Sequence, residues 1–377
     1  MTDQKRLLTL AQQLVSIPSE NPPGHEIEVA KALRSHLENY GISCMSIGPR
    51  SSPNLLFSTL EGQMGPLAIH GHMDTVPIGP RDAWTQDPLG GEVINGRLYG
   101  RGAADMKGPL ASLAETMIRY KEENHRTPLL MLATSGEEKG YTGAEDVAKS
   151  GVLKGVKYGV CAEPTSLNVF IGEKGILWTR LVTHGKAAHG SRPGEGLNAI
   201  DICIEALEIL TGLEYDSESD FLLGTQVINT GYIEGGARVN VVPDRCEARI
   251  DMRIVKGQTP EGILSSMNKR LNTSGLSNKA SVEIIHGNSA VITPFDSEIV
   301  SSAIEAVTKA TGQAPEPMAA PFGTDCSVLQ PRIGFLNVIC GPGSIEQAHQ
   351  VDEFIDVDQL YQSVDVYLRI ARHFSKE

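Results

Sequence analysis

The sequence predicts an α/β fold: a large layered domain with a mostly parallel sheet, interrupted by a smaller inserted domain. Apolar strand-like runs alternate with helical patterns up to residue 173, and the same alternation returns from residue 288 onward. Between them the order of predicted elements is β-α-β-β-α-β, the split-βαβ or ferredoxin-like arrangement, in which helices cover one sheet face. We therefore expect a discontinuous domain, 1–173 and 288–377, and an inserted domain, 174–287.

The first part of the chain alternates helical stripes with short apolar runs. Apolar positions at helical spacing predict amphipathic helices, and the fully apolar run at 128–134 is typical of a strand in a parallel sheet. In chain order we expect helices 4–16 and 26–40, strands 42–47, 54–59 and 67–72, a loop-rich stretch 75–100, helix 108–120, strand 128–134, helix 142–150 and strand 158–162.

The inserted segment begins with a strand-like alternation of apolar and polar residues. Its expected elements are strand 174–184, helix 196–213, strands 224–234 and 240–255, helix 260–271 and strand 280–286. The remaining chain returns to the first pattern, with helix 297–311, a loop to residue 321, strand 333–339 and helix 357–374.

Composition excludes several classes of protein. The 377 residues are enough for two domains, the net charge is −13, and no run of Lys and Arg stands out. This argues against nucleic acid or an anionic membrane as a partner. The six cysteines are scattered without close spacing, which favours reduced thiols in a cytoplasmic protein. No apolar run reaches the roughly 18 residues of a membrane helix, and the N-terminus does not resemble a signal peptide.

The stretch 67–74 carries the first candidate for chemistry. An apolar strand ends in His72, and Asp74 follows two residues later, on the same face of the chain. Such a pair suits a histidine that binds a metal while a carboxylate holds its ring. Alone the pair is weak, because a strand-end histidine near an aspartate more often forms a plain hydrogen bond.

Further ligand-type residues follow other predicted strands or lie in Gly-rich loops. They are Asp105, Glu137, Glu138, Glu163 and His349. Ligands of open α/β sheets bind at the carboxyl ends of the strands, and clustered carboxylates repel one another unless a cation holds them. Imidazole and carboxylate donors without thiolates favour Zn²⁺, with Co²⁺ or Mn²⁺ as substitutes.

These donors are sufficient for two cations. One bridging carboxylate, with a histidine and an acid on each side, would hold two metals roughly 3.5–4 Å apart and lower the pKa of a shared water from about 15.7 toward 7. Of the adjacent pair Glu137 and Glu138, one would bind metal and the other would take the proton of the water.

Three motifs in order resemble the M20 family of metallopeptidases and amidohydrolases. They are Gly-His-Met-Asp-Thr-Val-Pro at 71–77, Tyr-Gly-Arg-Gly-Ala-Ala-Asp-Met-Lys-Gly at 99–108, and Glu137–Glu138. The family includes acetylornithine deacetylase, succinyl-diaminopimelate desuccinylase, aminoacylase-1 and glutamate carboxypeptidase. The resemblance implies a zinc-exopeptidase-like layered domain with two zinc ions.

The resemblance also implies a role for each ligand. His72 and Glu163 would bind one zinc, Glu138 and His349 the other, and Asp105, with a cis peptide to Met106, would bridge them. Asp74 would orient His72, and Glu137 would act as general base and then as acid.

For the inserted domain, the resemblance implies a lid that commonly forms a homodimer interface. His189 would reach the partner's active site, although an exposed histidine there could also be merely solvated. Asn240 and Arg253 would bind a substrate carboxylate, and Gly323 and Thr324 would belong to a substrate loop. Alternatively, Arg253 would only pair with a neighbouring acid, and Thr324 would be an ordinary turn residue.

The expected function is hydrolysis of the amide bond of a small N-acyl amino acid with a free carboxylate. A metal-bridged hydroxide would attack, with Glu137 as base, and Glu163 in Ala-Glu-Pro-Thr resembles the deacetylase and desuccinylase branch. A dipeptidase or carboxypeptidase is the alternative, and a catalytically silent metal-bound binding protein is a third. His70 is expected to be a core residue, and Cys161 and Cys326 lie near the site without a part in this chemistry.

Overall fold

Four parallel strands form the middle of the larger sheet. Their order is β6 (Leu130–Thr134), β3 (Leu67–His72), β7 (Tyr158–Pro164) and β15 (Leu336–Gly341). Every residue of β3 and β6 is buried, as expected for strands covered on both faces. Further strands extend the sheet at both sides. Beyond β6 lie the antiparallel strands β2 (Asn54–Ser58) and β1 (Ser43–Ile47). Beyond β15 lies the antiparallel strand β8 (Phe170–Glu173), which neighbours β13 (Val291–Ile292) and β14 (Met318–Ala320). The predicted α/β class with a mostly parallel sheet is confirmed.

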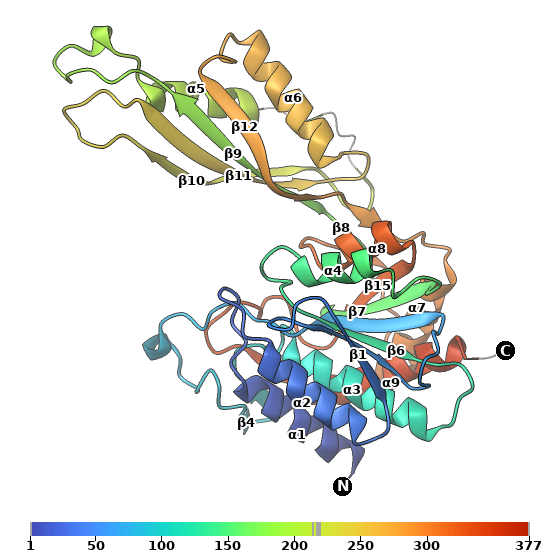
Figure 1. Ribbon diagram of the computed structural model, residues 1–377. Helices are drawn as coiled ribbons and strands as arrows, with labels where there is room; N and C mark the ends of the chain where they lie inside the picture. Colours follow the sequence, from blue (N-terminus) through green and yellow to red (C-terminus); the bar gives the residue numbers. More distant parts are fainter. Residues whose placement is uncertain (1, 213–214, 216–219, 376–377) are drawn as a thin grey trace. The chain divides into compact units, whose positions relative to one another are not determined.

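Helices cover both faces of this sheet (Figure 1). Helix α3 (Lys107–Glu122) packs on β3, β6 and β7 and is almost entirely buried, because α1 (Asp3–Ser16) and α9 (Val357–His373) pack against its outer side. Helices α4 (Thr142–Ser150) and α8 (Cys326–Ile333) pack together on the opposite face. Helix α2 (Ile27–Glu38) contacts β1 and β2, and α7 (Glu298–Thr311) packs against α9.

The computed structural model describes residues 2–212, 215 and 220–375, which form two units. The first unit comprises Met1–Gly172, Thr293–Ala319 and Thr324–Glu377, and the second comprises Glu173–Ile292 and Ala320–Gly323. In the described part of the chain, no helix is both long and apolar enough to cross a membrane.

The second unit has its own sheet and core. Its elements are β9 (Gly175–His184), α5 (Ala199–Thr211), β10 (Val227–Gly235), β11 (Arg245–Ile254), α6 (Pro260–Thr273) and β12 (Ala280–Asn288). The antiparallel sheet has the order β10-β11-β9-β12, and apolar residues of both helices share one core with inward-facing strand residues. Helix α5 begins after Asn198, whose side chain accepts a hydrogen bond from the Ile200 amide. Leu213, the expected end of this helix, lies outside the described residues.

Several parts of the first unit differ from the expected elements, and the strands β8 and β14 are among the elements that were not predicted. Helix α8 was not predicted. It ends at Ile333, followed by Gly334 in the left-handed region at φ +88°, so the strand expected from residue 333 begins at Leu336. The loop-rich stretch 75–100 contains a short 3₁₀ turn (Arg81–Ala83) and the strands β4 (Val93–Ile94) and β5 (Arg97–Tyr99). Strand β5 pairs with β16 (Phe354–Asp356), so this stretch is attached to the chain that follows residue 349. A second 3₁₀ turn, Pro193–Glu195, lies in the other unit.

Candidate metal centre

The carboxyl ends of the parallel strands position most of the candidate ligands. His72 is the last residue of β3 and pairs in register with Thr134, the last residue of β6. Glu137 and Glu138 follow Thr134 closely, and Glu163 is the next-to-last residue of β7. Since these strands run parallel, their ends deliver the side chains to one edge of the sheet. Asp105 joins them from the loop before α3, and His349 from the loop after β15.

Asp105 is shared between the two histidines. Its Oδ1 lies 2.9 Å from His72 Nε2, and its Oδ2 lies 3.4 Å from His349 Nε2. Glu163 Oε1 lies 3.6 Å from His72 Nε2, and Glu138 Oε1 lies 3.2 Å from His349 Nε2. The structure therefore brings the five predicted ligands into two groups of three that overlap at Asp105, and the ligand atoms within each group lie within 4.8 Å of one another.

The charges of these groups fit cations. Burial raises the pKa of Glu163 well above its usual value, with Asp105 and Glu138 adding to the effect and His72 opposing it. Burial likewise raises the pKa of Glu138, and Asp105 adds to it. Asp105 behaves in the opposite way: burial would raise its pKa, but hydrogen bonds from His349 and His72 outweigh burial and lower it. Crowded carboxylates of this kind are stabilised by a positive charge among them, and nitrogen and oxygen donors suit a divalent metal.

Asp74 acts on this centre mainly through the backbone. His72 Nδ1 donates to the Asp74 backbone carbonyl at 3.0 Å, whereas the Asp74 carboxylate lies 3.7 Å from the same nitrogen. That carboxylate instead accepts the backbone amides of Glu137 and Glu138, both at 3.1 Å, and the Asn21 side-chain amide at 3.1 Å. Asp74 therefore fixes both the ring of His72 and the turn that carries the two glutamates. The sequence predicted a contact between His72 and the Asp74 carboxylate, whereas the hydrogen bond goes to the Asp74 backbone carbonyl. The contacts of the carboxylate with the turn and with Asn21 were not predicted.

Glu137 lies beside the ligands and is half-buried. Burial raises its pKa well above the usual value; the neighbouring carboxylates Glu138 and Glu163 raise it further, and His72 opposes them. A carboxyl group whose pKa is shifted upward suits the exchange of a proton during a reaction. Glu137 also forms a third close group with His72 and Glu138, so its side chain is within reach of the same centre.

Glu353 and Arg101 hold the Asp105 loop, and sequence analysis did not single them out. Glu353 Oε1 accepts the backbone amides of Ala104 at 2.9 Å and Asp105 at 3.0 Å. Its Oε2 accepts Arg101 Nη1 at 2.6 Å, and the pair is almost fully buried. Because Glu353 follows His349 by four residues, this contact joins the loops of two ligands. The available signal was an acid close to His349 together with the arginine of the 99–108 motif.

The other predicted residues have different surroundings. Thr324 is fully buried at the start of α8, and its hydroxyl accepts the Cys326 amide at 3.0 Å. His189 is exposed, with Nδ1 2.8 Å from Ser191 Oγ. Arg253 pairs with Asp251 at 3.1 Å, as the alternative interpretation of this residue predicted. His189, Asn240, Arg253 and Gly323 belong to the second unit, and their role in binding substrate stays a prediction.

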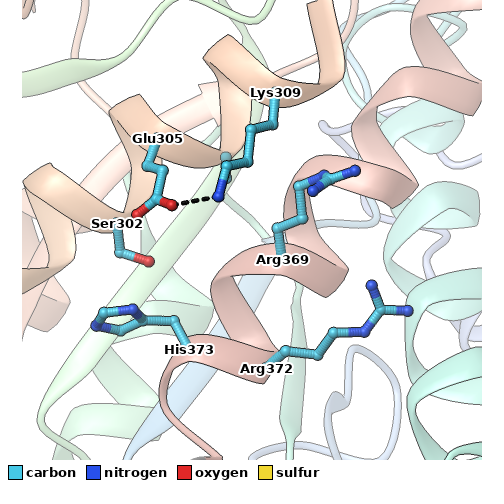
Figure 2. A pocket seen from close by; sticks show the side chains of 7 residues that line it. Ser302, Glu305, Lys309, Arg369, Arg372 and His373 are labelled. Carbon is cyan, nitrogen blue, oxygen red and sulfur yellow. Dashed lines mark hydrogen bonds and ion pairs between the residues drawn. The ribbon is translucent and has the colours of Figure 1, made fainter.

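A separate hollow of about 240 Å³ lies between α7 and α9 and carries several basic side chains (Figure 2). Each has an acidic partner. Lys309 pairs with Glu305 and Arg372 with Glu123, while Arg369 lies 2.8 Å from Asp365 and His373 lies 3.0 Å from Glu298. The basic groups therefore neutralise local acids, and the hollow offers no excess positive charge for an anion.

Comparisons with known proteins identify the family of this chain. Residues 68–373 match the model of peptidase family M20/M25/M40. The chain is 29% identical over 410 residues to "Probable succinyl-diaminopimelate desuccinylase" of Staphylococcus aureus strain MSSA476, covering 99% of this chain and 98% of that protein. It is 32% identical over 316 residues to "Acetylornithine deacetylase" of Myxococcus xanthus, covering 82% and 80% of the two chains.

Solved structures share the fold. The M20 family metallo-carboxypeptidase Sso-CP2 from Sulfolobus solfataricus superposes with a TM-score of 0.84 at 20% identity, covering 98% of this chain and 99% of that chain. Human carnosine dipeptidase 1 superposes with a TM-score of 0.72 at 17% identity, covering 99% and 96%. The fold, the site and the sequence relatives define a metal-dependent amidohydrolase or peptidase. The chain belongs to peptidase family M20/M25/M40.

Replacement of Glu353 by glutamine should weaken metal binding without removing a ligand. The amide nitrogen would face Arg101 in place of a carboxylate oxygen, so the loop that aims Asp105 would be held less firmly. Loss of a group that orients a ligand typically reduces metal affinity by about 10- to 100-fold. Calorimetric titration of the metal-free variant with zinc measures this change.

Glu346→Gln is the matched control, because Glu346 is exposed in the same loop. Equal zinc affinities for Glu353→Gln and Glu346→Gln would contradict the positioning role of Glu353.

Proposed function

We propose that this protein hydrolyses the amide bond of an N-acyl amino acid, of the deacetylase or desuccinylase type. The observation that carries the proposal is the Asp105 carboxylate, whose two oxygens face His72 and His349, with Glu137 beside the cluster. The relatives that match over most of their length and are named for deacylation support the choice of substrate.

The ligand set supports two zinc ions, for which Co²⁺ or Mn²⁺ would substitute. His72, Asp105 and Glu163 would hold one ion, and Asp105, Glu138 and His349 the other. When bound, such a pair lowers the pKa of a water molecule and polarises the substrate carbonyl. The protein's part is to hold these donors in a mostly buried place, which strengthens every charge interaction there.

Glu137 would move the proton. In its ionised form it takes a proton from the attacking water, and in its protonated form it gives that proton to the leaving amine. The Asp74 carboxylate supports this role, because it holds the Glu137 and Glu138 amides at 3.1 Å and so fixes the turn that carries both side chains. One side chain can then bind metal while the other faces the reacting water.

A free carboxylate on the substrate would be recognised by the second unit. Arg253 is half-buried and Asn240 is exposed, so both groups are accessible, and a guanidinium suits a carboxylate. Dipeptides also carry a free carboxylate, and a dipeptidase or carboxypeptidase is therefore the second candidate. A silent binding protein is disfavoured, because Glu137 is present beside a full ligand set.

The location we propose is the cytoplasm. None of the six cysteines, all of which lie within the described residues, forms a disulfide, and five of them are buried. Reduced cysteines without disulfides are typical of a reducing compartment.

The Glu137→Gln variant should bind metal normally and turn over substrate about 10²- to 10⁴-fold more slowly. This is the usual range for loss of a general base or acid. Metal content per chain and kcat, measured on the same preparation, test the prediction.

The neighbouring Glu138→Gln variant is the control, because it should lose metal as well as activity. The assignment of the two glutamates would be contradicted if Glu137→Gln lost metal while Glu138→Gln retained it.

N-acetyl and N-succinyl amino acids should be better substrates than unblocked dipeptides when compared by kcat/KM. Amidation of the substrate carboxylate should lower kcat/KM by about 10- to 100-fold, since a charged hydrogen bond contributes roughly 1.5–3 kcal/mol. Arg253→Ala should remove the preference for a free carboxylate over an amide. Arg245→Ala, on the same strand, should leave that preference unchanged. Faster turnover of dipeptides would favour the second candidate.

The second unit would also form a homodimer. Strand β10 is an edge strand of its sheet, and nearly all its residues are exposed, Tyr232 and Ile233 among them. An exposed apolar edge strand is a surface on which another chain can pair. A symmetric dimer through this unit would let His189 of each chain serve the partner's centre and stabilise the oxyanion.

Mixing two inactive variants, Glu137→Gln and His189→Ala, tests this arrangement. If His189 acts across the dimer, a mixed dimer has one intact site, and random exchange of subunits should restore about a quarter of the native activity. If His189 acts within its own chain, or the protein is a monomer, no activity returns. Analytical ultracentrifugation of the mixture confirms that dimers are present.

A further inference from the structure

Strands β3 and β7 carry a second set of ligand-type side chains behind the candidate metal centre. His70 and Cys161 are direct register partners on these strands. They precede His72 and Glu163 by two residues, so each lies on the same face of its strand as the ligand that follows it. Cys326, the first residue of α8, completes the set from the helix layer.

The three side chains are close together and sealed from solvent. A ring nitrogen of His70 and the sulfurs of Cys161 and Cys326 all lie within 4.8 Å of one another. The exposed fractions are 0% for His70 and 1% for each cysteine. The Phe335 ring packs edge-on against His70, with centroids 6.4 Å apart. Neither Cys161 nor Cys326 is in a disulfide bond.

Asn337 holds the imidazole beside the sulfurs. His70 Nε2 lies 2.9 Å from the Asn337 amide oxygen, which can accept its hydrogen, and 4.0 Å from Cys326 Sγ. His70 Nδ1 is buried, and among the described residues it has no hydrogen-bond partner. A buried nitrogen without a partner costs free energy, so the imidazole has capacity for one more ligand contact.

The donors differ in kind from those of the first centre. The first centre offers only imidazole and carboxylate groups, whereas this set offers two sulfurs and one nitrogen. Thiolates favour Zn²⁺ and softer cations over hard ones. Strands β3 and β7 therefore present a histidine and a carboxylate at their ends and, two residues earlier, a histidine and a thiol.

We propose that His70, Cys161 and Cys326 form a third metal site, for a thiophilic cation with Zn²⁺ as the natural occupant. Binding converts both thiols to thiolates, so one Zn²⁺ enters and two protons leave, with no change of oxidation state. The site is separate from the pair of ions proposed for hydrolysis and does not depend on that reaction.

A second pair of buried cysteines provides a comparison. Cys203 and Cys246 lie together in the core of the second unit. Among the described residues, no histidine or acid joins them in a group of three potential ligands. Two neighbouring thiols therefore occur in this chain both with and without a histidine.

Cobalt distinguishes the sites by spectroscopy. Co²⁺ bound by nitrogen and oxygen alone gives weak visible bands, whereas thiolate ligands add an intense charge-transfer band in the near ultraviolet. The protein is produced in zinc-depleted medium with cobalt, so that a buried site fills while the chain folds. We expect the native protein to show the charge-transfer band and to contain one more cobalt per chain than the Cys161→Ala/Cys326→Ala variant.

Single substitutions test whether a loss of the band in the double variant reflects misfolding. His70→Gln and Cys161→Ala should each lose or strongly reduce the band while keeping the weak visible bands of the first centre. Cys203→Ala/Cys246→Ala should keep the charge-transfer band. The proposal is overturned if the native protein lacks the band, or if its cobalt content equals that of the double variant. Either result could occur with full hydrolytic activity, which separates this proposal from the proposed function.

Discussion

The first unit depends on one arrangement, a buried carboxylate whose two oxygens face two histidines from distant parts of the chain. Asp105 lies 2.9 Å from His72 and 3.4 Å from His349 through different oxygens. Burying one carboxylate among others is costly unless positive charge compensates it. The surrounding structure is consistent with this requirement, because Glu353 and Arg101 hold the backbone of the Asp105 loop, and Asp74 holds the turn of the neighbouring glutamates.

Much of the fold and of this site could be predicted from the sequence, for a physical reason. Central parallel strands are continuously apolar, and in such sheets functional groups follow the strand ends. His72, Glu138 and Glu163 could therefore be placed at one edge before any contact was known. The resemblance to M20 proteins supplied the pairing of ligands and the cis bond between Asp105 and Met106, which the structure contains.

The residues that were missed act through contacts that no periodic pattern encodes. Glu353 reaches the amides of Ala104 and Asp105 across the small sheet of β16, β5 and β4, whose strands are too short to give an apolar period. Asn21 reaches Asp74 from a loop with two cis prolyl bonds. Helix α8 was not predicted because its eight residues include Pro331 and have a weak apolar stripe. The contacts of Glu353 and Asn21 are tertiary relationships between distant segments, and sequence spacing does not reveal such relationships.

The pairing of β5 with β16 has a consequence for the order in which the candidate metal centre is completed. It joins the segment just before Asp105 to the segment just after His349, and these are synthesised far apart in time. A chain that ends before residue 349 contains His72 and the acids Asp105, Glu137, Glu138 and Glu163 but lacks the second histidine and strand β16. The second group of proposed ligands can therefore be completed only after the chain has been synthesised through residue 349, and β5 gains its partner strand only a few residues later.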